Sequence, residues 1–194
     1  MQDILRQSLE NSIKAKEDFV SSQEQNLLLL VDVLVASFQR GGKLLLFGNG
    51  GSAADAQHLA AEFVNRFLID RKPLPALALT TDSSILTSIG NDFSYDDIFS
   101  KQIHALGKKE DVALGISTSG NSPNVVNAIQ AAREIGMHTA VLTGGNGGKL
   151  ASEAELVLNV PSDKTPHIQE THIWIEHMLC WLVDERMFGS LVNE

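Results

Sequence analysis

Residues 111–133 read DVALGISTSGNSPNVVNAIQAAR and predict three elements in direct succession. The apolar run from Val112 to Ile116 is typical of a buried strand. A turn of hydroxyl and amide side chains follows, from Ser117 to Ser122. Pro123 then begins a helical pattern, since serine is favoured at the N-cap of a helix and proline at its first position. The stretch therefore predicts a strand, a polar turn and the N-terminus of a helix.

The turn after this strand has the chemistry of an anion-binding site. Free backbone N–H groups and the helix dipole favour a phosphate at such a place. Hydroxyl groups can add hydrogen bonds without adding charge, and the turn offers four of them, on Ser117, Thr118, Ser119 and Ser122. The alternative is an ordinary capped helix, because turns are rich in Ser and Asn for local reasons. Recurrence of the pattern elsewhere in the chain favours phosphate binding.

The same pattern occurs twice more. Lys43 to Phe47 is an apolar run followed by GNGGS, whose last residue, Ser52, is expected to cap the next helix. A weaker copy is the run at 139–143, followed by GGNGG at 144–148. Strands that alternate with helices predict a parallel sheet, with ligands bound beyond the carboxyl ends of its strands. These glycine loops match neither the dinucleotide fingerprint nor the nucleoside-triphosphate loop.

The chain is acidic and otherwise ordinary in composition. Its 194 residues carry a formal charge of −9 at pH 7, and 43% of them are hydrophobic. These values predict one soluble domain and argue against nucleic-acid binding, which needs a basic surface. The only cysteine, Cys180, excludes an intramolecular disulfide and favours a cytoplasmic location. We expect no membrane contact, because the N-terminus lacks a signal pattern and the longest apolar run, Leu27 to Phe38, is too short to span a bilayer.

The N-terminal region predicts two helices. Residues 1 to about 20 have an amphipathic pattern, and residues 22–39 form a second helix that is apolar nearly all round. A helix of this kind must be covered on most sides. We expect contacts with another subunit to cover part of Leu27 to Phe38, the alternative being a helix buried inside one domain.

The helix after the glycine loop carries His58 and Glu62, four residues apart. At about 100° per residue these side chains lie on one face of the helix. Such a pair can be two metal ligands, a catalytic pair or a surface ion pair. Their apolar neighbours, Leu59 and Phe63, place the pair near a buried edge, which leaves all three interpretations open.

The closing helix is predicted from Thr165-Pro166 to about Met187. Gln169 and His177 lie about 80° apart around this helix, so both can point into one cleft. His172 and Glu176 are expected to form an exposed pair. Asn91 and Asp92 follow a short helix, where they can be turn residues only. Two further strands are expected at 75–80 and 156–161.

Five motifs in this order resemble the SIS-domain family of phosphosugar-binding proteins. They are GNGGSAADAQHLAAEF, GNDF, GISTSGNSPNV, LTGGNGGKL and HIQETHIWIEH. The resemblance covers nearly the whole chain. It implies an α/β fold with a single SIS domain over residues 1–194, built as a three-layer, flavodoxin- or Rossmann-like five-stranded parallel sheet flanked by helices. It also implies a homotetramer with sites at subunit interfaces and a helical extension at residues 1–40 that takes part in oligomerisation.

The resemblance also implies roles for particular residues. The phosphate loop falls on Ser117, Thr118, Ser119 and Ser122, with Ser52 contributing. The other substrate contacts fall on Asn49, Gly50, Gly51, Glu62, Asn91, Asp92 and Gln169. The ligands of one divalent ion per subunit, zinc, fall on His58, Glu62, Gln169 and His177, and the acid/base pair on Glu62 and His177. One departure is His167, where related proteins usually carry Arg, which puts in doubt a contact beside Gln169.

The activity that the resemblance implies is aldose–ketose isomerisation of sedoheptulose 7-phosphate through an enediol, the first step of ADP-heptose and lipopolysaccharide core synthesis. The alternative is a non-catalytic SIS protein that binds a phosphosugar or associates with a replication initiator. Both branches share the glycine and hydroxyl loops. The acid/base positions separate them, because the non-catalytic branch lacks the Glu and His that stand here at Glu62 and His177.

Overall fold

The computed structural model describes residues 1–189 of the chain. Its strands are β1 (Leu44–Gly48), β2 (Ala76–Ala78), β3 (Val112–Ile116), β4 (His138–Gly144) and β5 (Leu156–Val160). Its helices are α1 (Gln2–Gln39), α2 (Gly51–Val64), α3 (Ser83–Asp92), the 3₁₀ turn η1 (Tyr95–Asp97), α4 (Ser100–Leu106), α5 (Pro123–Ile135), α6 (Leu150–Glu153) and α7 (Thr165–Phe188).

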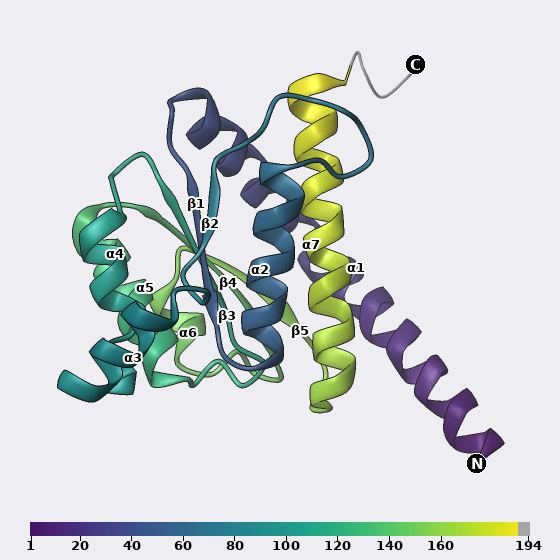
Figure 1. The fold of residues 1–194 in the computed structure, drawn as a ribbon. Helices are drawn as coiled ribbons and strands as arrows, with labels where there is room; N and C mark the ends of the chain where they lie inside the picture. The colour runs from purple at the N-terminus through teal and green to yellow at the C-terminus, as the bar shows by residue number, and fades with distance from the viewer. Residues whose placement is uncertain (190–194) are drawn as a thin grey trace.

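The five strands form one parallel sheet in the order β2-β1-β3-β4-β5 (Figure 1). Every neighbouring pair is parallel, with Leu44 opposite Val112 and Leu114 opposite Ala140. Parallel neighbours need a crossover, and helices supply it after each strand. The predicted parallel, five-stranded α/β fold is therefore confirmed, with strand ends shifted by a few residues at most.

Helices cover both faces of the sheet. Figure 1 shows α1, α2 and α7 on one side and α3, α4, α5 and α6 on the other. The inner strand β1 reflects this arrangement, because Leu44 and Leu46 belong to one hydrophobic core and Leu45 and Phe47 to the other. A strand buried on both faces needs a continuous apolar run, as the sequence of β1 has. The predicted three-layer architecture follows.

The prediction of two N-terminal helices is wrong, because α1 is continuous from Gln2 to Gln39. Residues 21–25, near the expected boundary, are polar but contain neither Pro nor Gly. Ser21 and Ser22 instead donate hydrogen bonds to the carbonyls of Glu17 and Asp18 at 2.8 and 2.7 Å. This back-bonding within one helix satisfies the hydroxyls without ending it.

Most of Leu27 to Phe38 is buried within the chain, and the expectation that another subunit covers part of this segment, where Leu29 is 52% exposed, stays a prediction. Leu30, Val31 and Leu34 are fully or almost fully buried within the chain, because α1 packs there against α7 and β5. Exposed apolar side chains gather instead on the N-terminal half of α1, which extends away from the sheet (Figure 1): Met1, Ile4, Leu5, Leu9 and Ile13. The second half of α1 is therefore part of the core, and the first half is the free surface.

Within residues 1–189, no helix combines the length and apolar character needed to cross a bilayer.

Candidate active site

Two of the predicted loops meet where the strand order reverses. From β1 the chain first adds β2 on one side and then crosses to β3 on the other. The chain therefore leaves the carboxyl ends of β1 and β3 in opposite directions. Open parallel sheets bind ligands in the crevice between two such neighbouring loops. The glycine loop at 49–51 and the hydroxyl loop at 117–122 occupy this switch point.

An amide pair joins the glycine loop to the first turn of α5. Asn49 donates to Asn124 Oδ1 at 2.8 Å, and Asn124 donates back to Asn49 Oδ1 at 2.9 Å. The Tyr95 hydroxyl, from η1, donates to the same Asn49 oxygen at 3.2 Å. Asn124 is 2% exposed, so its side chain is committed to this contact. Asn49 was predicted from the resemblance, whereas Asn124 and Tyr95 were not, because contacts between a loop, a helix and a 3₁₀ turn have no periodic pattern in the sequence.

The hydroxyl loop has the form predicted for phosphate binding. Ser122 is the N-cap of α5 and Pro123 its first residue, as expected. The Ser122 hydroxyl makes no capping bond and instead lies 2.9 Å from the hydroxyl of Ser117. Ser119 is exposed, with its hydroxyl accepting from the N–H of Asn121 at 3.2 Å. The loop therefore places hydroxyls and the positive end of a helix dipole at one open edge of the sheet.

The close approach of neighbouring loops explains the glycine at position 120. Gly120 has φ of +63°, and a Cβ there would lie 1.9 Å from the carbonyl oxygen of Gly147, in the loop after β4. Only glycine tolerates both the left-handed conformation and this contact. The glycine-rich loop at 144–148, the weakest of the three predicted repeats, thus packs against the hydroxyl loop and supports it.

The glycine loop contacts the closing helix. A Cβ at Gly51 would lie 2.6 Å from Nε2 of Gln169, so glycine lets the Gln169 amide approach the backbone. The prediction that Ser52 caps α2 is wrong, because Gly50 is the N-cap and Ser52 lies buried in the first turn. With Gly50, at φ +57°, as its N-cap, the helix begins two residues earlier than it would with Ser52 as the cap.

Helices α2 and α7 lie side by side and bring the predicted acid/base residues together (Figure 1). The Nε2 atoms of His58 and His177 are 3.0 Å apart, a hydrogen bond in which one ring carries the shared proton. A Glu62 oxygen lies 3.7 Å from the same His58 nitrogen. Phe67 stacks on the His177 ring with centroids 5.4 Å apart. The side chains of His58 and Glu62 remain 42% and 23% exposed, so solutes can reach them.

The nitrogen and oxygen atoms of this cluster meet some of the requirements for binding a divalent ion. Two imidazole nitrogens on one tetrahedral zinc ion, each about 2.0–2.1 Å from it, would stand roughly 3.3 Å apart, close to the spacing of His58 and His177. Within residues 1–189, however, no group of three or more His, Cys, Asp and Glu side chains is already arranged to hold a metal. The contact that the structure gives Gln169, the fourth expected ligand, is with Gly51 of the glycine loop.

The expectation of an exposed pair at His172 and Glu176 is wrong, because both side chains are fully buried. Helix α7 packs against α1, α2 and β4, so most of its surface is covered. His172 Nε2 bonds the carbonyl of Thr143 at 3.0 Å, and burial lowers the pKa of His172 to about 4. Burial, followed by the nearby charge of Asp55, raises the pKa of Glu176 well above its usual range.

Three other predicted positions lie apart from the histidine pair. Asn91 and Asp92 are exposed at the end of α3, where Asn91 donates to Asp92 at 2.8 Å. They lie close in sequence to Tyr95, which reaches Asn49. His167, where an Arg was expected from the resemblance, is 9% exposed and lies 3.4 Å from an oxygen of Glu170. It is thus held by its own helix.

Comparison with known proteins defines the class. A family model described as the SIS domain matches residues 9–144. A curated phosphoheptose isomerase from Desulfovibrio desulfuricans is 52% identical, with 97% of this chain and 90% of that protein covered. Another from Clostridium acetobutylicum is 46% identical over the full length of both. The solved structure of a phosphoheptose isomerase from Neisseria gonorrhoeae superposes with a TM-score of 0.90 at 44% identity, covering 95% of this chain and 98% of that one.

These matches and the fold, with its switch-point loops and its helix pair α2 and α7, define the same class of protein, an SIS-domain protein. More narrowly, the chain belongs to the phosphoheptose isomerase family.

Proposed function

We propose that this protein converts D-sedoheptulose 7-phosphate to D-glycero-D-manno-heptose 7-phosphate, the first step towards ADP-heptose and the lipopolysaccharide core. Family membership supports an aldose–ketose isomerase. The observation that carries the proposal is the meeting of one carboxylate and two imidazoles, within 3.0 and 3.7 Å, on a fold whose switch-point loops suit a phosphate. Incubating the purified protein with sedoheptulose 7-phosphate and following the aldose by NMR tests it.

The reaction moves one proton between adjacent carbons. A base removes a proton from C1 of the ketose while the carbonyl oxygen on C2 gains one, which gives an enediol. Protonation at C2 and loss of the proton from the C1 hydroxyl then give the aldose, with no net oxidation. A positioned carboxylate can carry the carbon-bound proton, and an imidazole can exchange protons with the two oxygens.

We assign these roles to Glu62 and His177. Glu62 is the carboxylate that lies next to the histidine pair. His177 is held on both sides, by the stacked ring of Phe67 and by His58 Nε2. An oriented ring with one shared proton suits proton exchange with oxygen atoms, because one tautomer can donate where the other accepts.

The phosphate is assigned to the hydroxyl loop, and the double variant Ser119→Ala/Ser122→Ala tests it. We expect KM to rise about 10- to 100-fold, at roughly 1–1.5 kcal/mol for each lost hydrogen bond, with kcat changed much less. Steady-state kinetics measure both constants. The matched control is Ser21→Ala/Ser22→Ala, which removes two hydroxyls bonded only to α1 carbonyls. An unchanged KM in the loop variant would contradict the placement.

We also propose one divalent ion, zinc, for each subunit, held by His58, Glu62, Gln169 and His177. The support is the pair of ring nitrogens 3.0 Å apart with a carboxylate beside one of them. When bound, the ion would act as a Lewis acid that stabilises negative charge on the substrate oxygens. The protein residues position that charge and move the protons.

Metal removal tests this assignment. We expect the purified protein to carry about one zinc ion per subunit, and chelation to lower turnover until Zn²⁺ is restored. Elemental analysis and activity before and after dialysis against a chelator measure the effect. His58→Gln should lower zinc content, and His138→Gln, at the amino end of β4 and away from the site, should not. Metal content below a tenth of an ion per subunit with an unchanged rate would rule the ion out.

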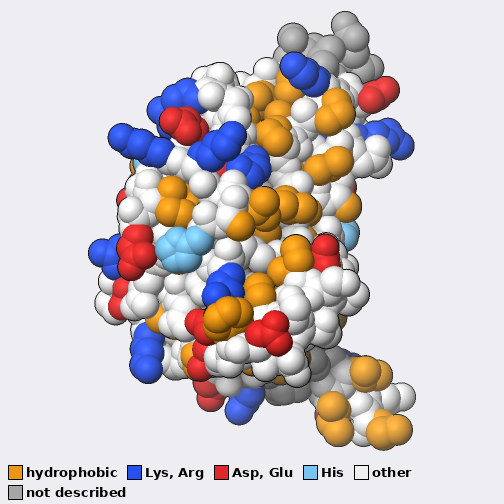
Figure 2. All heavy atoms as spheres, turned by 60° about the vertical axis from the view of Figure 1, so that its left-hand side comes forward, with side chains coloured by type: hydrophobic (Ala, Val, Ile, Leu, Met, Phe, Trp, Pro, Cys, Tyr) orange, Lys and Arg blue, Asp and Glu red, His pale blue; other side chains and the backbone are white. Residues whose placement is uncertain are grey.

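We propose that the protein is a homotetramer with sites at its interfaces. The exposed apolar side chains on the first half of α1 support self-association, since monomers rarely leave such a stripe bare. On another face, Figure 2 shows hydrophobic side chains in a band through the middle, with Lys and Arg at its upper left. We also place the protein in the cytoplasm, where the buried thiol of Cys180 would stay reduced.

Sedimentation tests the assembly. We expect a species of four times the 21.0 kDa chain mass at micromolar concentration. Leu5→Ser/Leu9→Ser should shift the protein to smaller species, because both side chains lie on the exposed stripe, at 72% and 63% exposure. Gln7→Ser, a polar change on the same part of α1, is the control. A native monomer under these conditions would refute the proposal.

A further inference from the structure

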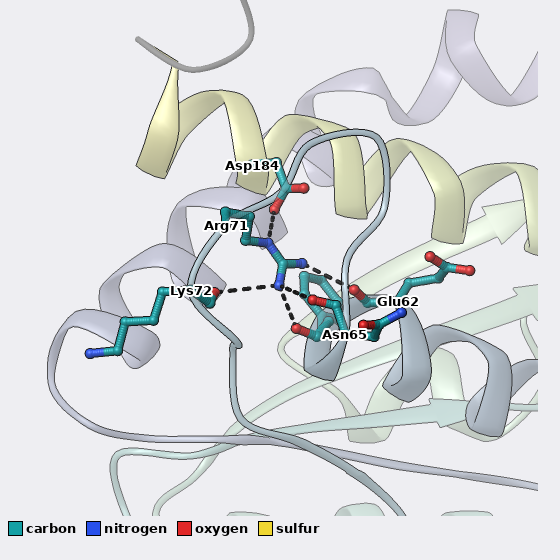
Figure 3. A network of polar contacts seen from close by, with 6 residues as sticks. Glu62, Asn65, Arg71, Lys72 and Asp184 are labelled. Atoms are coloured by element: carbon teal, nitrogen blue, oxygen red, sulfur yellow. Dashed lines mark hydrogen bonds and ion pairs between the residues drawn. The ribbon is translucent and has the colours of Figure 1, made fainter.

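Arg71 is a buried cation whose role lies outside the reaction described above. It belongs to the segment between α2 and β2, and its side chain is fully buried (Figure 3). A buried guanidinium must be satisfied by several acceptors, because leaving a charge unpaired inside a protein is costly. Its contacts therefore show what it holds in place.

One side of the guanidinium closes the end of α2. Nη1 donates to the carbonyl of Phe63 at 2.7 Å, and Nη2 donates to the carbonyl of Glu62 at 3.0 Å. The last carbonyls of a helix lack partners within it. Helix α2 has neither a basic residue in its last turn nor a glycine at its C-cap, where Asn65 stands. Arg71 donates to each of these carbonyls, beside the Leu74 N–H that also donates to the Phe63 carbonyl at 3.0 Å, and it places a positive charge at the negative end of the helix dipole.

The other side of the guanidinium holds α7. Nε donates to Asp184 Oδ1 at 2.8 Å, and the Asp184 side chain is only 3% exposed. Asp184 lies seven residues after His177, which places both side chains on nearly the same face of α7, the face that meets α2. One side chain thus joins the backbone of Glu62 to the helix that carries His177 (Figure 3).

Stability alone does not explain this pair. Replacing a buried ion pair by apolar side chains of similar size is often neutral or stabilising, so such a pair is weak grounds for a stabilising role. Burial raises the pKa of Asp184, and Arg71 offsets this only in part. The forked guanidinium does provide fixed geometry, since it reaches two carbonyls of one helix and a carboxylate of another at once.

We propose that Arg71, through Asp184, is a positioning residue that holds Glu62 in register with His177. The inference rests on the proposed function, in which these two residues share the proton transfers. A displacement of about 1 Å in a catalytic group can cost on the order of 10²-fold in rate. Arg71 touches neither the hydroxyl loop nor the glycine loop through any hydrogen bond within residues 1–189, so substrate affinity should be spared.

The test compares three variants with the native protein. Arg71→Lys keeps the charge but loses the fork, Arg71→Met/Asp184→Leu replaces the pair by apolar side chains, and Arg133→Met removes the exposed pair with Glu153 as control. Assays run well below each melting temperature, with folding checked by circular dichroism. We expect kcat about 10- to 100-fold lower in the first two, KM within threefold of native, and a native control. A double variant that is folded and within twofold of native kcat would overturn the proposal.

A second measurement separates this inference from the proposed function. Selective ¹⁵N labelling of histidine reports the imidazole signals of His58 and His177 without substrate. We expect Arg71→Lys to shift both signals and to leave His138 unchanged, whether or not the native protein turns over sedoheptulose 7-phosphate. Native signals for both rings in Arg71→Lys would overturn the positioning role even in an active enzyme.

Discussion

Glu62→Gln is expected to lower kcat by at least about 10²- to 10⁴-fold, the usual contribution of a well-placed base. Glutamine keeps the size of the side chain and part of its hydrogen bonding but cannot accept a proton from carbon. The Glu62 side chain is partly exposed and lies 3.7 Å from His58, so its loss leaves no buried charge behind. The melting temperature and the size of the assembly should therefore stay close to native.

A matched control is available at the opposite edge of the sheet. Glu155 lies 3.1 Å from His138, a second carboxylate–imidazole pair at the amino ends of β5 and β4. Glu155→Gln should leave kcat within about twofold. Exchange of the substrate's carbon-bound proton with solvent gives the decisive readout, and a native exchange rate in Glu62→Gln would mean that another group is the base.

His177→Gln is expected to have an effect of similar size, about 10²- to 10⁴-fold on kcat, because the oxygens of the enediol would lose their proton donor and acceptor. The variant also removes the partner of His58 and the ring that stacks on Phe67. Steady-state kinetics at saturating substrate measure the loss.

Loss of a bound ion could imitate loss of a catalytic acid, so metal content must be measured beside activity. His58→Gln removes a proposed ligand without removing the proposed acid, and His138→Gln changes an exposed histidine far from the site. A metal-loaded His177→Gln protein with native kcat would contradict the assignment. The role of His177 as the acid would be supported if His58→Gln stays active while it holds its metal and becomes as inactive as His177→Gln only when the metal is lost.

Local patterns explain why the fold was predictable. The runs at 44–48 and 112–116 are apolar at every position except a glycine, each is followed by a polar or glycine-rich turn, and helix-spaced apolar residues come next. Such alternation leaves little choice besides a parallel sheet covered on both faces. The position of the hydroxyl loop at 117–122 followed from the same pattern, because Ser122 and Pro123 mark the start of α5.

Burial and contacts across the sequence could not be predicted in this way. The spacing of His172 and Glu176 fits a surface pair, yet α1, α2 and β4 cover that part of α7. Nothing local in the sequence at 20–25 distinguishes one long helix from two, since hydroxyl side chains serve both caps and helix interiors. Asn124 and Arg71 gain their roles only from partners 75 and 113 residues away, Asn49 and Asp184.

The most direct measurement is isomerisation of sedoheptulose 7-phosphate by the native protein in D₂O, followed by NMR. Proton transfer through an enediol predicts an aldose phosphate that carries deuterium at C2, and recovered ketose that carries deuterium at C1. Both signals should fall together in Glu62→Gln. If the zinc-supplemented native protein yields no aldose phosphate, or if Glu62→Gln forms it at the native rate, the proposed mechanism is contradicted.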